Sequence, residues 1–522
     1  MLHVSIFVEG LRSRPQLMFW LAALVQGAIW WLVPSIFYAA PPGELPDVLA
    51  VGHEFQLGTD LGPPLAFWLA DIVYMILGIG GVYLLAQACV VVTYWAVFQL
   101  GSAIVGAQQA AMAVMLMLGI TVMTVPSPDF GPPILGMALS ALIALHFWRA
   151  IGEHQRHYWF VLAFDLGLLL LTTYAGLILF ACVMTFLWAT ERGRAALRTV
   201  EPWFAAIVVA VLLFPHLIWL DVAGETAFAP LWERLHSGEA ASTNWLSWVR
   251  LIAFVLIAHA GLLVIVGLAT GWWIRPRDPL PTFVRPAVDP FARRFVFFFA
   301  LAPIVVATLI SAIFGVPSPV GGTAPYVTLS GLAVVLAAGD TIMIHRQRIV
   351  ALAWILLLLL PPAIAVAAVV AVPWTAAIEL KSAQPARQMG RFFGESFERR
   401  TGRPLEIVSG DPRLAALVAL AAPSRPSVYD FAAPTRTPWV GNDDIRAKGL
   451  IVVWQALDTA GLPPPDIKAR FPDLVPELPR AFEHAIQGRL PLSRSGWGMI
   501  RPQAEAPKYP ALIAPAVSAP SV

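Results

Sequence analysis

A series of long apolar stretches constrains this chain more than any other feature of its sequence. Their ranges are 17–39, 80–100, 103–124, 133–149, 158–173, 175–190, 203–220, 250–273, 295–314, 326–344 and 349–372. A helix of about 20 mostly apolar residues is enough to cross a bilayer. Hydrophobic residues make up 58% of the chain and charged residues only 13%, which excludes a soluble globular protein. The sequence therefore predicts a polytopic α-helical membrane protein with about 11 transmembrane helices.

Two stretches leave the number of spans open. Residues 63–79 are apolar but short, and we expect a helix that lies at the membrane interface or dips into it. Residues 158–190 could instead form one broken element, because Thr172, Thr173 and Tyr174 interrupt them without a loop. A change at either place would reverse the orientation of everything downstream.

The distribution of arginine predicts the orientation in the membrane, because cytoplasmic connections carry an excess of Lys and Arg. One alternating set of connections holds Arg12, Arg14, Arg149, Arg156, Arg192, Arg194, Arg198, Arg275, Arg277, Arg285, Arg293, Arg294, Arg346 and Arg348. The opposite set contains Arg234 in its interior and Arg250 at the edge of a span. We therefore expect a cytoplasmic N-terminus, and we expect the opposite set of loops to face away from the cytoplasm.

The composition changes abruptly after residue 373, and no lysine precedes Lys381. Amphipathic helical stretches then alternate with short strand-like runs. These are Ala383–Arg400, Leu405–Ser409, Pro412–Ala422 and Leu450–Trp454. The sequence predicts a membrane domain over 1–372, a small extracytoplasmic α/β domain over 373–502, and a Pro/Ala-rich disordered tail over 503–522.

The loop at 40–65 is the first candidate for chemistry. It contains Glu44, Asp47, Glu54 and Asp60 but no Lys or Arg. A carboxylate at the membrane surface can act as a general base, or it can hold a divalent metal near a phosphate leaving group. A short helix would place Glu44 and Asp47 on one face, because they are three residues apart. The alternative is that the loop is acidic only because cations are excluded from it.

A second carboxylate lies in the loop 125–133, which is expected on the same side of the membrane. Asp129 stands there between prolines, just before an apolar stretch. This position is compatible with a site residue and equally with an N-cap of the following helix.

Histidine and cysteine give weaker signals. His53 lies in the acidic loop and His216 ends an apolar stretch, but neither has metal-ligand spacing, and both can be structural or interfacial. Cys89 and Cys182 lie in apolar stretches without a CxxC spacing, as expected for core residues. The net charge of +2 gives no sign of a nucleic-acid partner.

Four motifs resemble, in order, those of GT-C glycosyltransferases. They are Glu44-Leu45-Pro46-Asp47 with Gln56-Leu57-Gly58 and Pro63-Pro64-Leu65; Pro126-Ser127-Pro128-Asp129; Gly167-Leu168-Leu169-Leu170-Leu171-Thr172-Thr173-Tyr174; and Phe214-Pro215-His216-Leu217-Ile218-Trp219. The branch they resemble is the bacterial dolichyl-phosphate-mannose protein mannosyltransferase-like group, which includes the lipid A aminoarabinose transferases. The resemblance covers roughly residues 17–350. Glu44, Gly62 and Thr173 stand where this group usually has Asp, His and Lys.

This resemblance implies a GT-C fold in the bacterial inner membrane, with the site loops and the C-terminal domain in the periplasm. It also implies inverting transfer of a sugar from a polyprenyl-phosphate donor to an envelope lipid, a glycan or a protein hydroxyl. The absence of a Walker loop, and of G-x-G-x-x-G after a strand, agrees with a donor that is not a nucleotide sugar.

The candidate site residues follow from these motifs and from charge. Glu44, Asp47 and Asp129 are the catalytic candidates, and Asp47 and Asp129 are also the candidate ligands of a divalent metal. The candidate substrate-binding residues are His53, Asp60, Arg234 and Arg250. The two arginines are the cations expected on the same face, where they could pair with the lipid phosphate, although both could instead be interfacial anchors.

Two other functions stay open at this stage. A transporter would also be polytopic and would more often show ionisable residues within its spans, for which Asp71, Asp165 and Asp340 are the candidates. A non-catalytic GT-C homologue that acts with a partner is the second alternative, and the residues at Gly62 and Thr173 favour it.

Overall fold

We describe a computed structural model of the chain. It covers residues 9–10, 13–236, 245–270, 282–284, 287–338, 341–343, 347–376, 378–456 and 459–503. The chain forms two compact units. The membrane unit is Met1–Pro385 with His484–Pro491, and the C-terminal unit is Ala386–Glu483 with Leu492–Val522. The predicted tail 503–522 lies outside the described residues from residue 504 onward.

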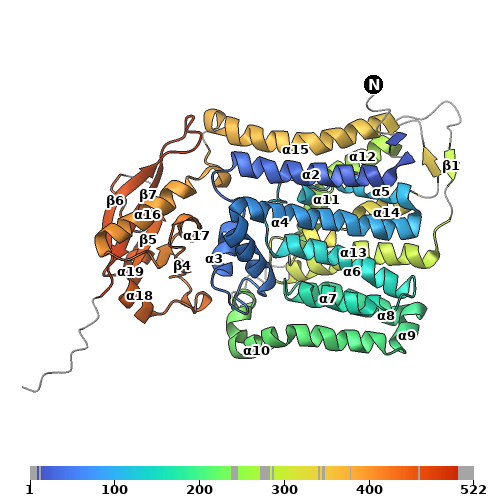
Figure 1. Ribbon diagram of the computed structural model, residues 1–522, viewed down its shortest axis with the longest axis horizontal. Coiled ribbons are helices and arrows are strands. Elements are labelled where there is room, and N and C mark those ends of the chain that lie inside the picture. The colour runs from blue at the N-terminus through green and yellow to red at the C-terminus, as the bar shows by residue number, and fades with distance from the viewer. Residues whose placement is uncertain are drawn as a thin grey trace, which may run out of the picture. The chain divides into compact units, whose positions relative to one another are not determined.

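The membrane unit is mostly helical. Its helices are α2 (Pro15–Phe37), α3 (Leu45–Gly52), α4 (Leu65–Val105), α5 (Ala107–Met117), α6 (Pro132–Ile151), α7 (Tyr158–Leu170), α8 (Gly176–Ala189), α9 (Glu191–Leu197), α10 (Glu201–His236), α11 (Trp245–Ala258), α12 (Ala260–Thr270), α13 (Pro290–Ile313), α14 (Ser330–Ala337) and α15 (Gln347–Thr375). Short 3-10 turns are η1 (Thr121–Met123), η3 (Ala324–Tyr326) and η4 (Lys381–Ala383), and an antiparallel ribbon joins β1 (Thr282–Val284) to β2 (Thr341–Met343). The long helices α2, α4, α6, α10 and α15 run roughly along one common axis (Figure 1).

Helix α6 is the centre of this bundle. In its most apolar stretch 89% of the residues are buried, against 11% for α10 and α15. Phe147 of α6 contacts the rings of Phe186, Phe295 and Phe299, which come from α8 and α13. Such aromatic contacts bury large areas and fix neighbouring helices against each other. Helices α10 and α15 are therefore peripheral, with most of their apolar side chains facing outward.

The polytopic helical fold is confirmed, but the count of 11 spans is not. Among the described residues, six helices are long and apolar enough to cross a membrane. The number rises to eight if the bent pairs α8–α9 and α11–α12, with bends of 99° and 60°, each count as one span. The predicted spans at 103–124 and 326–344 correspond to α5 and α14, which are short. Apolar stretches therefore overestimate the number of complete crossings when helices end early or bend.

Residues 63–79 and 80–100, predicted as separate segments, form two helical segments of α4 that a kink at Gly78 separates. Within α4 the backbone at Gly78 has φ 65° and ψ −165°, which is not helical. Glycine adopts a positive φ without the steric cost that a Cβ brings. The bend therefore separates a segment beginning at Leu65 from the long remainder of the helix.

The ionisable residues predicted within spans have histidine neighbours. His146 Nδ1 and Asp165 Oδ2 lie 2.5 Å apart, and both residues are buried. His53 Nδ1 lies 3.7 Å from an oxygen of Asp71, whose side chain is fully buried. Charged groups in an apolar interior are stable only when they are paired or neutralised. Both carboxylates therefore have a structural explanation, and Asp340 lies outside the described residues.

The C-terminal unit is a small α/β fold, as predicted. Its sheet has the order β4-β3-β5-β7-β6, in which β3 pairs parallel with β4 and β5 while the other pairs are antiparallel. The strands are β3 (Ile407–Gly410), β4 (Ser427–Tyr429), β5 (Leu450–Gln455), β6 (Val475–Phe482) and β7 (Ser493–Ile500). The helices are α16 (Ala386–Thr401), α17 (Pro412–Ala421), α18 (Asn442–Lys448) and α19 (Pro465–Arg470), and η5 (Pro434–Arg436) is a 3-10 turn.

Alternation along β5 builds a core on each face of this sheet. Ile451 and Val453 belong to one buried cluster, while Leu450, Val452 and Trp454 belong to the other. Successive residues of a strand point to opposite faces, so a strand that is apolar throughout is covered on both sides. The predicted strand Leu450–Trp454 is therefore a central one.

Helix α14 approaches α5 so closely that a side chain would not fit between them. A Cβ added at Gly331 would lie 2.2 Å from the carbonyl oxygen of Ala113. We predict that Gly331→Ala separates the two helices and lowers the Tm of the purified protein by several degrees, because overpacking a tight interface is destabilising. The matched control is Gly80→Ala, whose Cβ would have Ser35 Oγ at 3.9 Å as its nearest neighbour. Equal Tm values for the two variants would contradict this packing.

Candidate functional site

The acidic first loop folds around the short helix α3. Leu45 and Leu49 are fully buried and anchor this helix to the rest of the unit. Glu44 is the N-cap residue and its side chain is exposed, while Asp47 lies half-buried in the first turn. Carboxylates near a helix N-terminus are stabilised by the free N–H groups and the dipole there. The predicted short helix is confirmed, and Glu44 and Asp47 lie at its start.

The second loop brings Asp129 to the same helix end. The backbone N–H of Glu44 donates to both carboxylate oxygens of Asp129, at 3.1 and 3.3 Å. Gly43 makes this approach possible, because a Cβ there would lie 1.8 Å from Asp129 Oδ2. Gly43 also has φ +52°, a conformation that favours glycine. The structure thus brings into contact two loops that the sequence alone could only place on the same side of the membrane.

Two buried glutamines hold the loop that carries Asp129. Gln87 of α4 donates to Ser127 Oγ at 3.1 Å, and Gln26 of α2 donates to the carbonyl of Met123 at 2.6 Å. Both glutamines are almost fully buried. Buried polar side chains of this kind specify one loop position, because breaking the bond would leave a desolvated polar group. Sequence reasoning missed these residues; glutamine within an apolar stretch was the available signal.

The other two residues predicted from the first loop have different surroundings. His53 follows α3 and faces the buried Asp71 of α4, as described above. Asp60 is at the tip of a tight turn, in which Thr59 and Gly62 exchange both backbone hydrogen bonds, at 3.0 and 3.2 Å. The turn makes Asp60 half-exposed. A role of either residue in binding substrate stays a prediction.

The motifs at 167–174 and 214–219 contact the second half of the first loop. The N–H of Leu65 donates to the carbonyl of Leu171 at 3.0 Å, so α4 begins where α7 ends. His216 of α10 donates from Nδ1 to the carbonyl of Leu57 at 2.7 Å, and Trp219 packs over Gly58, where a Cβ would lie 2.5 Å from the indole. All four sequence motifs therefore contribute to one region of the membrane unit.

Tyr174 completes this region from the turn between α7 and α8. Its ring stacks on that of His216, with centroids 5.8 Å apart. Burial raises the pKa of Tyr174 to about 12, so its hydroxyl stays neutral at physiological pH. Tyr174 thus contributes an uncharged polar group and an aromatic face.

The two predicted arginines are not brought to these carboxylates by any contact that the structure describes. Arg250 of α11 is exposed. Arg234 lies on α10 in a part whose side chains are outside the description. Their pairing with a lipid phosphate stays a prediction.

Comparison with known proteins agrees with this arrangement. The family described as dolichyl-phosphate-mannose-protein mannosyltransferase matches residues 62–219. The match includes Asp129 and His216 but not Glu44 or Asp47. ArnT from Cupriavidus metallidurans, bound to undecaprenyl phosphate, has a similar structure, with TM-score 0.56, 12% identity, and coverage of 92% of this chain and 97% of that one. The chain has the GT-C fold.

Two further structures are more distant. The oligosaccharyltransferase of Archaeoglobus fulgidus in its apo form gives TM-score 0.42 and 13% identity, covering 84% of this chain and 69% of that one. AglB from the same organism, in complex with an inhibitory peptide and a dolichol-phosphate, gives TM-score 0.39 and 13% identity, covering 80% of this chain and 64% of that one. No protein of curated function matches the chain in sequence. The resemblance inferred from the four motifs is confirmed.

The predicted metal is not supported by the residues of this GT-C site. Among the described residues, no three His, Cys, Asp or Glu side chains converge closely enough to hold a metal ion. A Mg²⁺ ion that also contacts a substrate phosphate, however, needs only one or two protein carboxylates. A divalent metal held by Asp47 and Asp129 therefore stays a prediction.

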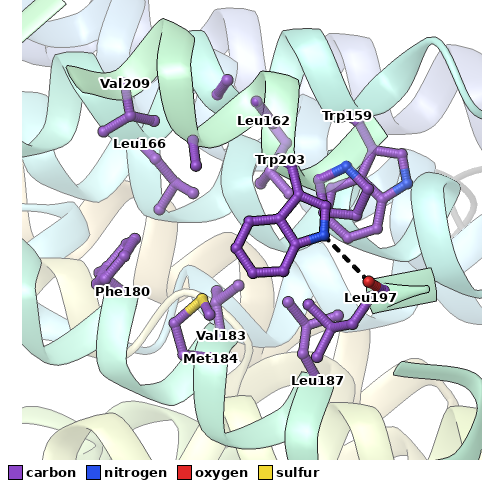
Figure 2. A pocket seen from close by; sticks show the side chains of 14 residues that line it. Trp159, Leu162, Leu166, Phe180, Val183, Met184, Leu187, Leu197, Trp203 and Val209 are labelled. Atoms are coloured by element: carbon purple, nitrogen blue, oxygen red, sulfur yellow. Dashed lines mark hydrogen bonds between the residues drawn. The ribbon is translucent and has the colours of Figure 1, made fainter. Parts of the chain in front are cut away.

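An apolar cavity of about 130 Å³ lies away from this region, between α7, α8, α9 and α10. Figure 2 shows its lining, in which Trp203 donates to the carbonyl of Leu197 at 3.1 Å. Its other side chains are apolar, among them Trp159 and Leu187 near the ends of α7 and α8 that lie far from the first loop. Without a titratable group it cannot carry acid–base chemistry, and it is not the candidate site.

The contact between the two loops can be tested at Gly43. We predict that Gly43→Ala displaces the Asp129 carboxylate, so that the Glu44 amide loses its acceptor and exchanges with deuterium at least several-fold faster. The measurement is hydrogen–deuterium exchange of a peptide that covers residues 40–52. Gly62→Ala is the control, because Gly62 also has a positive φ but no atom lies within 4 Å of its added Cβ. Equal exchange in wild type and Gly43→Ala would contradict the contact.

Proposed function

We propose that this chain is a membrane glycosyltransferase that transfers a sugar, with inversion, from a polyprenyl-phosphate donor. The acceptor is a hydroxyl of an envelope glycolipid, a glycan or a protein on the periplasmic face of the bacterial inner membrane. The observation that carries the proposal is the convergence of Asp129 with the start of α3, which bears Glu44 and Asp47. The GT-C fold and the family match at residues 62–219 support the same conclusion.

A lipid-linked donor agrees with the surroundings of the site. ArnT from Cupriavidus metallidurans, which has a similar fold, was solved with bound undecaprenyl phosphate. Here α10, which contacts the first loop, exposes Phe214, Leu217 and Ile218, a surface suited to lipid chains. A nucleotide sugar would need a soluble phosphate-binding loop, and the sequence has no motif of that kind. An acceptor embedded in the envelope reaches such a site without leaving the membrane surface.

The proposed reaction is a single displacement at the anomeric carbon. The acceptor oxygen attacks that carbon as its proton passes to the Glu44 carboxylate. A new C–O bond forms, the bond between the anomeric carbon and the phosphate oxygen breaks, and polyprenyl phosphate leaves with the electron pair. Attack from the face opposite the leaving group inverts the configuration. Glu44 suits the role of base because its side chain is exposed while its backbone is held by Asp129.

Asp129 and Asp47 support this step in different ways. Asp129 fixes the position of Glu44 through the backbone, which reduces the freedom of the base before the reaction. Asp47, three residues later and therefore on a neighbouring position of the same helix face, orients the acceptor hydroxyls. Arg234 and Arg250 remain the candidates for pairing with the phosphate, and His53 and Asp60 for contacting the sugar.

The decisive test is sugar transfer by variants expressed in cells that lack the gene. We predict that Glu44→Gln lowers the transfer rate by about 10²-fold or more, because a general base contributes 10²–10⁴-fold, while donor affinity stays unchanged. Asp129→Asn should also lower the rate, since it weakens the hold on Glu44. The measurement is mass spectrometry of envelope lipids and glycans from cells lacking the gene, complemented by each variant, with the lost sugar increment identifying the product.

Glu153→Gln is the matched control, because Glu153 is an exposed carboxylate in the connection between α6 and α7. Restoration of the increment by both wild type and Glu44→Gln would transfer the role of base to Asp47 or Asp129. No difference in any glycan upon loss of the gene would instead favour a non-catalytic GT-C homologue or a transporter.

A further inference from the structure

His216 is a buried polar residue next to the candidate site. It lies on α10, is 4% exposed, and contacts the carbonyl of Leu57 in the first loop at 2.7 Å. Its ring lies between two others, with Tyr174 at 5.8 Å and Trp219 at 5.5 Å between centroids. The side chain is therefore fixed in position and orientation by the loop and by the stacked rings.

The hydrogen bond to Leu57 determines what the second nitrogen can do. A carbonyl oxygen only accepts, so His216 Nδ1 carries the proton. His216 Nε2 is closed off from solvent and has no hydrogen-bond partner among the described residues. A buried polar atom without a partner is costly, so a ligand that supplies a partner for Nε2 would be stabilised there.

His259 provides an internal comparison. Its Nδ1 also donates to a backbone carbonyl, that of Val255, at 2.7 Å. Its Nε2, however, lies 2.8 Å from Ser330 Oγ, so both nitrogens are satisfied. The fold thus completes the hydrogen bonding of the half-buried His259 and leaves that of the buried His216 open.

The charge of the surroundings sets a requirement that an anionic ligand must meet. The first loop has four carboxylates and no Lys or Arg, so an anion entering here needs a group that becomes positive. An imidazole can take up a proton when an anion arrives, because the anion offsets the desolvation of the cation. The faces of Tyr174 and Trp219, both within about 6 Å, favour a cation between them.

The outer side of α10 indicates what the anion is attached to. Phe214, Leu217 and Ile218 flank His216 and are 62%, 49% and 52% exposed. A long apolar chain can lie along these side chains while its head group turns toward the loop. The ligand reaches Nε2 only if Trp219 or the first loop moves aside, since the atom is closed off in this structure.

We propose that His216 Nε2 binds a phosphate oxygen of the polyprenyl-phosphate group, with its Nδ1 held by Leu57. This inference rests on the proposed function and deepens it by naming a phosphate-binding residue on α10. His216 acts there as a binding residue for the head group of the lipid and takes no part in proton transfer from the acceptor.

The test is the affinity of the purified full-length protein for undecaprenyl phosphate in detergent. His216→Asn keeps an amide where Nδ1 stands, so that the bond to Leu57 can form, but it removes Nε2. We expect its dissociation constant to rise about tenfold or more, as for the loss of a charge-assisted hydrogen bond, with a Tm close to that of wild type. His259→Asn is the matched control and should bind undecaprenyl phosphate like wild type.

Two further binding measurements identify the ligand. Undecaprenol, which has no phosphate, should bind wild type and His216→Asn equally. Phosphatidylglycerol should not displace undecaprenyl phosphate at equal concentration, and displacement would overturn the assignment to a polyprenyl phosphate. If wild type binds undecaprenyl phosphate and His216→Asn binds it equally well, the inference about His216 is wrong while the proposed function stands. If wild type does not bind it, both are wrong.

Discussion

The hydrogen bond from the Glu44 N–H to the Asp129 carboxylate is the contact on which the candidate site depends. It joins two loops that are 85 residues apart in sequence. Three carboxylates near one another would repel, so their proximity needs compensation. The free N–H groups at the start of α3 supply it, because a helix N-terminus favours negative charge. The helix start and Asp129 thus stabilise each other, and Glu44 is held in place through its backbone N–H.

Much of this arrangement could be predicted from sequence because it depends on local chemistry. The spacing of Glu44 and Asp47, the prolines around Asp129 and the apolar stretches each have direct structural consequences. The number of spans could not be predicted in this way. Whether an apolar stretch crosses, stops or bends depends on tertiary contacts, such as the bend at Gly78 or the 99° turn between α8 and α9. Hydropathy records that a residue is apolar, and it contains no information on where a helix axis turns.

The residues that sequence reasoning missed share a physical reason. Gly43 matters because a carboxylate from another loop occupies the space of its Cβ, and Gln87 matters because Ser127 lies opposite it. Neither partner is near in sequence, so neither role leaves a local pattern. His216 was recognised as part of a motif, yet its unsatisfied nitrogen becomes visible only when its surroundings are known. Local patterns predict where carboxylates lie, whereas long-range contacts decide how they are oriented.

Polar groups inside the membrane unit illustrate why that nitrogen matters. Within an apolar environment an uncompensated polar or charged group costs several kcal/mol, on the order of 2–7 for a neutral one. The fold meets this cost at Asp165 with His146 and at His259 with Ser330. At His216 the fold satisfies only Nδ1, through the carbonyl of Leu57. The second nitrogen, Nε2, lies next to an acidic loop and a lipid-facing helix surface without a hydrogen-bond partner among the described residues. A lipid with a phosphate head group satisfies both Nε2 and the helix surface, because its phosphate offsets the imidazolium while its chain covers the exposed apolar side chains of α10.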